Sequence, residues 1–394
     1  MAGAASSRRA RRGGAAAPVL PDDVAVWEIL VRLPAKELLR CRAVCRSWRR
    51  LTSAADFLLA HHRRQPSLPL AFFHSRSGWG PAAVDAFDVR RAPAERRPVL
   101  GFDYYSHHRG FTLHASCDGL LLLSLCSSRF YICNPATRHW AALPKLTGCS
   151  VSALYRHSLS GDYRILYWKG HGNAAAVYYV LTVGSSEEPR CIGLPVELQS
   201  LKQVIRWGLN NTTMHPPVLL HNCLHWVARY MILDKLIIFD TVVESFRGMY
   251  SPTGVTGRAS LLEMNGTLGI SLVNGNSRTT GAVVWVLQDY KMELWSMKYK
   301  IEFPLVEISR ITERKFFYVD VVSENGDMLL TCGCSVPWYM FHIDSKGKLL
   351  EKYRWDDIVS EVIGHSFKES LVRHSFFQKR DDGSGRLPLF FRGL

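Results

Sequence analysis

The segment from Val24 to Leu33 constrains the fold of this chain more than any other stretch. Its only polar residues are Glu28 and Arg32, which lie four positions apart with the acid first, the order that stabilises a helix. A helix that is apolar on nearly every side has to be covered on more than one face. We therefore expect either the rest of the chain or a partner protein to cover this segment.

Short helices continue beyond this segment. Pro21 suits the first turn of the first helix, and Pro34 ends that helix and can open the next one, from Ala35 to about Arg42. Apolar residues at helical spacing predict a third helical piece, and these are Val44, Trp48 and Leu51. Because segments below about 40 residues rarely fold unaided, two interpretations are open: a helical hairpin packed on its own domain, and a module that a partner completes.

The order of residues in this region resembles an F-box. The motif residues are Leu20, Pro21, Glu28, Ile29, Leu30, Leu33, Pro34, Leu38, Leu39, Arg40, Val44, Cys45, Arg46, Ser47 and Trp48. The resemblance implies that the helices bind a Skp-type adaptor, which bridges to a cullin–RING ubiquitin ligase, and that the chain is the substrate receptor of an SCF complex. The adaptor-facing residues that it implies are Leu20, Pro21, Ile29, Leu30, Leu33, Pro34, Leu38, Leu39, Val44, Cys45 and Trp48. Surplus apolar side chains on small helices agree with binding to a partner.

The chain is basic, with 49 Lys and Arg residues against 34 Asp and Glu residues and a formal net charge of +15. The cluster from Arg8 to Arg12 lies in a tail rich in Gly, Ala and Ser, which predicts disorder for residues 1–17. A nuclear-import or phosphate-binding patch is the alternative. No zinc-finger, helix-turn-helix or RNA-binding aromatic motif accompanies the cluster, so specific nucleic-acid binding is not expected.

The ten cysteines show no framework of pairs. The basic N-terminus lacks the apolar core of a secretory signal, and no apolar run approaches the roughly 20 residues of a membrane span. We therefore expect no membrane association, a reducing setting in the nucleus, the cytoplasm or both, and free buried thiols.

From Leu70 onward, short apolar runs alternate with turn residues, which predicts an all-β domain. The predicted strands are 70–74, 84–89, 120–125, 130–133, 163–168, 176–183, 223–228, 236–240, 267–272, 283–287, 316–321, 328–332, 339–343 and 349–355. Three turn-and-strand elements resemble the strand starts of kelch-like blades, and they span 116–121, 221–226 and 263–268. At about 40–50 residues per blade, we expect a β-propeller of six or seven blades.

The same region resembles the F-box-associated domain of plant F-box proteins. The matching stretches are SCDGLLLL, FYICNPATRHWAALP, DYRILYW, LHWVAR, LIIFDTVVESFRGM, LLEMNGTLGISL and VVWVLQDYKMELW, and the likeness runs from about residue 70 to 355. One departure is His221-Asn222, which stands in place of the usual Asn-Gly turn. The expected order is a basic tail over 1–17, an all-α F-box of three helices over 18–64, a linker over 65–69, the propeller over 70–378 and a tail over 379–394.

Few residue groups suggest metal or redox chemistry. His221, Cys223 and His225 alternate, so on a strand they would share one face, but a zinc site needs a fourth ligand. Cys332 and Cys334 also alternate. Packing within a blade is the favoured interpretation for both groups, and packing between helices is favoured for Cys41 and Cys45. We therefore expect no metal and no cofactor.

Aromatic residues beside turns are candidates for recognition. Trp79, Trp207, Trp338 and Tyr339 flank Gly or Pro turns and, if exposed on loops, would suit binding of a protein or peptide. Packing in the blade cores is the favoured alternative. For Tyr104-Tyr105 and His107-His108, an ordinary polar turn is favoured over a ligand-binding loop.

The sequence contains no phosphate-binding loop, dinucleotide fingerprint, nucleophile elbow or zinc-protease motif. This favours a non-catalytic adaptor that holds an unknown protein substrate near the ubiquitin-charged enzyme, where tethering raises the effective concentration of substrate lysines. Two alternatives are a β-propeller enzyme, which needs a convergent metal or acid–base cluster, and a basic nucleic-acid-associated protein that depends on residues 1–17.

Overall fold

The computed structural model describes the greater part of the chain. The described residues are 24–75, 79–90, 95–106, 111–125, 129–170, 176–192, 209, 216–227, 235–252, 258–274, 280–312, 317–321, 323, 325–332, 337–356 and 358–377. The chain divides into two compact units, Met1–Gln65 and Pro66–Leu394. The predicted tails over 1–17 and 379–394 lie outside the described residues.

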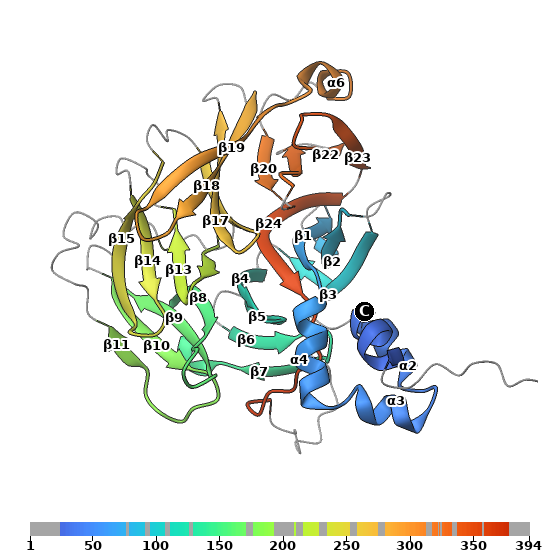
Figure 1. Ribbon diagram of the computed structural model, residues 1–394, viewed down its shortest axis with the longest axis vertical. Coiled ribbons are helices and arrows are strands. Elements are labelled where there is room, and N and C mark those ends of the chain that lie inside the picture. The colour runs from blue at the N-terminus through green and yellow to red at the C-terminus, as the bar shows by residue number, and fades with distance from the viewer. Residues whose placement is uncertain are drawn as a thin grey trace, which may run out of the picture. The chain divides into compact units, whose positions relative to one another are not determined.

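The first unit is helical, as predicted (Figure 1). Its elements are the π-helical turn η1 (Ala25–Ile29), the 3-10 turn η2 (Leu30–Arg32), α2 (Ala35–Cys41), α3 (Arg46–Leu51) and α4 (Ala55–Arg64). Pro34 separates η2 from α2, because its ring excludes an interior helical position while its extended backbone (φ −55°, ψ 152°) opens the next helix.

The third helix begins later than the sequence spacing predicts. α3 starts at Arg46, and Cys45 is its N-cap in an extended conformation with φ −152°. The Cys45 sulfur accepts a hydrogen bond from the backbone N–H of Trp48 at 3.4 Å. Val44 therefore lies on the connecting turn instead of on the helix, although Trp48 and Leu51 are helical as expected.

The described residues of the second unit form six four-stranded antiparallel sheets, the blades of a β-propeller (Figure 1). Blade 1 contains β24 (Ile358–Lys368), β1 (Ser67–Ser75), β2 (Trp79–Asp88) and β3 (Glu95–Ser106). Blade 2 contains β4 (Phe111–Cys117), β5 (Leu120–Leu125), β6 (Arg129–Asn134) and β7 (His139–Ala142), and blade 3 contains β8 (Ser150–Arg156), β9 (Tyr163–Lys169), β10 (Val177–Thr182) and β11 (Arg190–Ile192). The all-β prediction is confirmed, and its range of six or seven blades resolves to six.

The other three blades follow the same order. Blade 4 contains β12 (Val218–Leu220), β13 (Cys223–Trp226), β14 (Lys235–Asp240) and β15 (Ser245–Tyr250). Blade 5 contains β16 (Arg258–Met264), β17 (Thr267–Asn274), β18 (Gly281–Asp289) and β19 (Leu294–Glu302), and blade 6 contains β20 (Phe317–Val321), β21 (Met328–Cys332), β22 (Trp338–Ile343) and β23 (Leu349–Trp355). Two short helices, η4 (Pro144–Leu146) and α6 (Leu305–Ser309), lie between blades in the sequence.

Blade 1 closes the ring because it combines the two ends of the propeller. β24 pairs with β1 in antiparallel register, with Leu68 opposite Phe367 and Phe73 opposite Ser360. The first strand therefore begins at Ser67, inside the predicted linker over 65–69. Leu68 of this strand is buried. Pro69, which has no backbone N–H to donate, is tolerated because the β1–β24 pairing shifts register between Pro69 and Ala71.

Neighbouring blades share their hydrophobic cores. Among the described residues, each of the six interfaces carries one cluster of buried side chains. Each cluster contains residues of two neighbouring blades, for example Phe72 and Leu123, Leu122 and Ile165, Tyr178 and Phe239, Ile238 and Ile270, Val284 and Phe341, and Phe73 and Met340. Because no blade covers both of its own faces, the ring stabilises each blade through its neighbours.

Two kinds of tight turn recur at one end of the blades. Between the first two strands of blades 2, 4 and 5, both turn residues have φ between 50° and 82°, and the pairs are Asp118-Gly119, His221-Asn222 and Asn265-Gly266. Type I′ hairpin turns require this conformation. The three turn-and-strand elements predicted from the sequence are confirmed, including the His221-Asn222 variant.

The second kind of turn joins the last two strands of a blade. The side chains of Asp240, Asp289 and Asp344 each accept a backbone N–H from the residue two positions on, at 2.8, 2.8 and 2.9 Å. A carboxylate in this position holds the turn in shape. In blades 4 and 5, the residue four positions after the aspartate is a glutamate at positive φ, Glu244 and Glu293.

After β24, a segment that we call the C-terminal strap (residues 369–377) runs along blades 2 and 3. Asn134 Nδ2 donates to the Ser370 carbonyl at 2.9 Å, and the Phe377 ring stacks on His139 at 5.9 Å. Gly119 has φ +82°, and a Cβ on it would clash with Ser370. Glycine is therefore needed there both for its backbone conformation and for the close approach of the strap.

We expect Gly119→Ala to destabilise the protein more than Gly266→Ala. Gly266 occupies the equivalent turn position of blade 5 with φ +74°, but a Cβ there would meet nothing within 4 Å. Both variants carry the cost of a left-handed residue, about 1–2 kcal/mol, and Gly119→Ala adds the displacement of the strap, about 1–3 kcal/mol. Urea unfolding of the full chain measures the difference, and equal losses would show that the strap does not press on Gly119.

Candidate functional site

The helical unit is held together by contacts of α4 with the apolar first segment. The rings of Trp27 and Phe57 meet edge to face at 5.5 Å. His61 Nε2 lies 2.8 Å from the Leu33 carbonyl, which also accepts a hydrogen bond from Gln65 Nε2 at 3.0 Å. Leu33 stands just before Pro34, so these side chains satisfy a carbonyl at the end of η2.

The predicted adaptor-facing residues divide into covered and open side chains. Leu30 and Leu38 are buried. Ile29, Leu39 and Val44 are exposed by 41–68% of their surface, Cys45 is also exposed, and Leu33, Pro34 and Trp48 are half-buried. Leu20 and Pro21 lie outside the described residues. A direct contact of Leu30 or Leu38 with a partner would require the unit to open, so their role in this structure is to support the others.

Exposed Val44 is presented by a fixed turn between α2 and α3. Arg42 Nε donates to Thr52 Oγ1 at 3.1 Å, and Thr52 Oγ1 donates to the Trp48 carbonyl at 2.7 Å. These bonds tie the turn to the end of α3. An ordered apolar side chain on a small unit loses little conformational entropy when a partner covers it.

His61 is a buried titratable residue of the helical unit. Its Nε2 donates to the Leu33 carbonyl, since a carbonyl only accepts, and its Nδ1 has no hydrogen-bond partner. Burial, followed by repulsion from His62 and Arg42, lowers the pKa of His61 below 6.5, although the bond to Leu33 opposes this. The neutral ring is therefore the form that the folded unit accommodates.

We expect the helical unit to lose stability as the pH falls below 6.5. Above that value His61 is neutral in both states, whereas below it the unfolded chain binds a proton that the folded unit resists until the lowered pKa is reached. Hydrogen exchange of the α4 amides in the full chain, compared at about pH 7.5 and about pH 5.5, measures the effect. In His61→Gln the exchange of the α4 amides should depend less on pH than in wild type, and in His62→Gln it should depend on pH as in wild type. If His61→Gln showed the same pH dependence as wild type, His61 would not be the group responsible.

His221, Cys223 and His225 do not lie together on one strand face. His221 lies in the turn at φ 51°, so it does not continue the face of β13. His225 is buried, its Nδ1 donates to the Val218 carbonyl at 3.0 Å, and its Nε2 accepts from the Tyr290 hydroxyl at 2.8 Å. Burial lowers the pKa of His225 to about 4. Both ring nitrogens are engaged within the protein, as the packing interpretation predicted.

Other candidates from the sequence are also placed, in part, by the structure. Trp338 and Tyr339 are buried, which confirms core packing for these two aromatic residues. Trp207, His107, His108 and Cys334 lie outside the described residues, as do the side chains of Trp79, Tyr104, Tyr105 and Cys332. Within the described ranges, no cluster of three or more His, Cys, Asp or Glu side chains could hold a metal ion, and no helix is long and apolar enough to cross a membrane.

A buried ion cluster between blades 3 and 4 was not predicted from the sequence. Glu244 accepts hydrogen bonds from the Tyr155 hydroxyl at 2.7 Å and from Arg164 Nη1 at 2.6 Å, and it also pairs with Arg190. The Glu244 side chain is almost fully buried. Its carboxylate therefore joins the turn of blade 4 to three donors on blade 3. The recurring spacing from Asp240 to Glu244 and from Asp289 to Glu293 is the sequence signal that points to such a turn.

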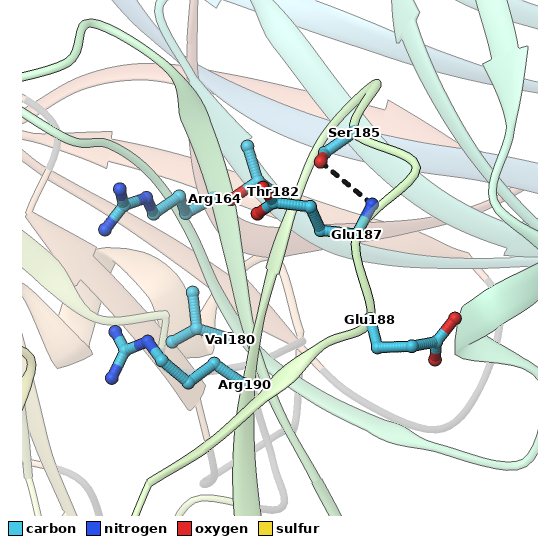
Figure 2. A pocket seen from close by; sticks show the side chains of 7 residues that line it. All are labelled: Arg164, Val180, Thr182, Ser185, Glu187, Glu188 and Arg190. Carbon is cyan, nitrogen blue, oxygen red and sulfur yellow. Dashed lines mark hydrogen bonds between the residues drawn. The ribbon is translucent and has the colours of Figure 1, made fainter.

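A pocket of about 140 Å³ lies beside this cluster on blade 3. Its lining residues are Arg164, Val180, Thr182, Ser185, Glu187, Glu188 and Arg190. Figure 2 shows Arg164 and Arg190 extending in the same direction, while Glu188 points away from them. Because the two guanidinium groups are already paired with Glu244, the pocket is best explained as the solvated edge of the ion cluster.

We expect Glu244→Gln to destabilise the propeller by about 3 kcal/mol, because it leaves two guanidinium groups facing a neutral side chain. Arg190 is partly exposed, so the solvent screens part of this cost. Glu188→Gln is the control, since Glu188 is exposed in its ion pair with Lys145. Thermal unfolding of both variants measures the change in the free energy of unfolding. A decrease below about 1 kcal/mol for Glu244→Gln would show that the ion cluster does little to hold blades 3 and 4 together.

Comparison with known proteins agrees with this architecture. A family model described as the F-box associated beta propeller domain matches residues 99–379, and an F-box-like model matches residues 17–63. The chain belongs to the F-box-associated β-propeller family. The resemblance inferred from the sequence is thereby confirmed, together with the order of a helical F-box region and a propeller.

Relatives in Arabidopsis thaliana share both parts. F-box protein At1g30790 is 23% identical over 387 residues, which cover 87% of this chain and 91% of the relative. F-box protein At5g65850 is 24% identical and covers 83% of this chain and 82% of the relative. F-box protein At5g49610 is 24% identical, and the match covers 71% of this chain and 78% of the relative.

Proposed function

We propose that this protein is the substrate-recognition subunit of an SCF ubiquitin ligase. The helical unit binds a Skp-type adaptor, and through it the cullin–RING ligase, while the propeller binds a protein substrate. The chain carries out no chemistry of its own, since tethering alone raises the effective concentration of substrate lysines at the enzyme. Its expected location is the nucleus, the cytoplasm or both.

The observation that supports this proposal most directly is that four side chains of the helical unit at positions of the F-box motif, Ile29, Leu39, Val44 and Cys45, are exposed. Burying a large aliphatic side chain at such a contact is worth about 1.5–3 kcal/mol before association costs. The alternative of a propeller enzyme has weaker support. Among the described residues, the polar groups of Glu244 and His225 form hydrogen bonds to other side chains of the protein, so they are already engaged within the fold.

We expect Ile29→Glu and Val44→Glu each to weaken binding of a Skp-type adaptor at least about tenfold, which corresponds to roughly 1.4 kcal/mol. Each change places a charge where apolar surface would be buried, and neither side chain supports the interior of the unit. Isothermal titration of the full chain with a purified adaptor measures the affinity.

The control for this experiment is Leu59→Glu. Leu59 lies on α4, is as exposed as Leu39 and is not among the predicted adaptor-facing residues. Its variant should bind the adaptor as the wild type does, and circular dichroism should show all three variants folded. Equal affinity of wild type, Ile29→Glu and Val44→Glu would refute the proposed docking surface.

A further inference from the structure

The outer strand of blade 5 leaves its first half uncovered. Tyr250, Met292, Leu294 and Met297 are exposed by 54–69%. Two bonds join these residues across blades 4 and 5: Trp295 Nε1 donates to the Tyr250 carbonyl at 2.9 Å, and the Tyr250 N–H donates to Glu293 Oε2 at 2.7 Å. We call Tyr250 together with residues 292–298 the β19 surface.

The second half of β19 is covered by the turns of blade 6. A Cβ on Gly326 would clash with the Tyr299 ring, and a Cβ on Gly347 would clash with the Glu302 carbonyl. The strand register breaks between the two halves, since Met297 faces Trp285 and Tyr299 faces Val284. Lys298 is thus a bulge residue that marks the end of the uncovered half.

The charges around the β19 surface are unevenly engaged. The Asp289 carboxylate accepts the backbone N–H groups of Lys291 and Met292, at 2.8 and 2.9 Å, and Glu293 accepts that of Tyr250. In contrast, Lys291 and Lys298 form no ion pair with any described residue. The Lys298 ammonium lies 5.3 Å from the centre of the Tyr299 ring, a contact that leaves its charge without a carboxylate partner. The surface therefore offers apolar side chains flanked by ammonium groups that have no ion-pair partner among the described residues, and such groups complement carboxylates.

The backbone of β19 is also open on one side. β19 is the last strand of its sheet, in the order β16-β17-β18-β19, and no further strand pairs with it among the described residues. An extended segment can add to such an edge through main-chain hydrogen bonds, while its alternate side chains reach the surface beside it.

We propose that the β19 surface binds an extended segment of the client protein, rich in Asp or Glu and in apolar side chains, as an added strand. This inference rests on the proposed function, because it assigns the place where the receptor holds its substrate. Carboxylates pair with Lys291 and Lys298, and the apolar side chains lie against Tyr250 and Met297, since Met297 shares the face of β19 from which Trp295 reaches Tyr250.

Fluorescence anisotropy of a short labelled peptide that alternates Glu and Leu tests this inference on the full chain. Wild type should bind this peptide at least about tenfold more tightly than a peptide with Lys in place of Glu. Met297→Glu and Lys298→Glu should each weaken binding of the acidic peptide about tenfold. The control Leu350→Glu alters an exposed apolar residue of β23 and should change nothing.

Several outcomes would overturn the inference. These are no binding of the acidic peptide to wild type, equal affinity for the acidic and basic peptides, or unchanged affinity in Met297→Glu and Lys298→Glu. A peptide N-methylated at alternate residues that binds as well as the parent would refute strand addition. Adaptor binding is measured on the same samples: wild type that binds the adaptor and not the peptide refutes only this inference, whereas wild type that binds the peptide and not the adaptor refutes only the proposed function.

Discussion

The pairing of β24 with β1 is the interaction on which the propeller depends. It brings residues 67–75 and 358–368 into one sheet, so that the last strand of the domain completes its first blade. Since every blade shares its core with two neighbours, an open ring would leave two blade faces in water. The C-terminal strap adds a second constraint, because it contacts Asn134 of blade 2 and Tyr163 of blade 3 and so fixes the chain beyond β24.

Local patterns in the sequence predict much of this architecture. Strands such as 120–125 and 236–240 follow from their apolar composition and flanking turns, and the turn at His221-Asn222 follows from its place in a repeated element. The start of β1 at Ser67 does not follow, because Pro66 and Pro69 lie beside it and its partner on β24 is Lys368, at the other end of the domain. Pairing partners at such separation leave no mark in local composition, which explains why the predicted linker extends too far.

The candidate adaptor site shows a related limit of sequence reasoning. The motif identifies a set of apolar positions, but Leu30 and Ile29 are adjacent in the chain and only one of them is open to a partner. Which side chain faces inward depends on the phase of η1 and η2, whose winding differs from that of a regular α-helix. A pattern of residue types cannot supply that phase, so the division into supporting and exposed residues comes only from the structure.

Blades 4 and 5 show how one turn serves two purposes. Glu244 and Glu293 occupy the same position after an aspartate-held turn, and each reaches the preceding blade. Glu244 meets two guanidinium groups and is buried, which locks blade 4 to blade 3. Glu293 instead accepts the backbone N–H of Tyr250 and forms no ion pair with a described residue. The same turn therefore closes one interface with a buried carboxylate, whereas Met292 and Leu294 stay exposed beside the next one.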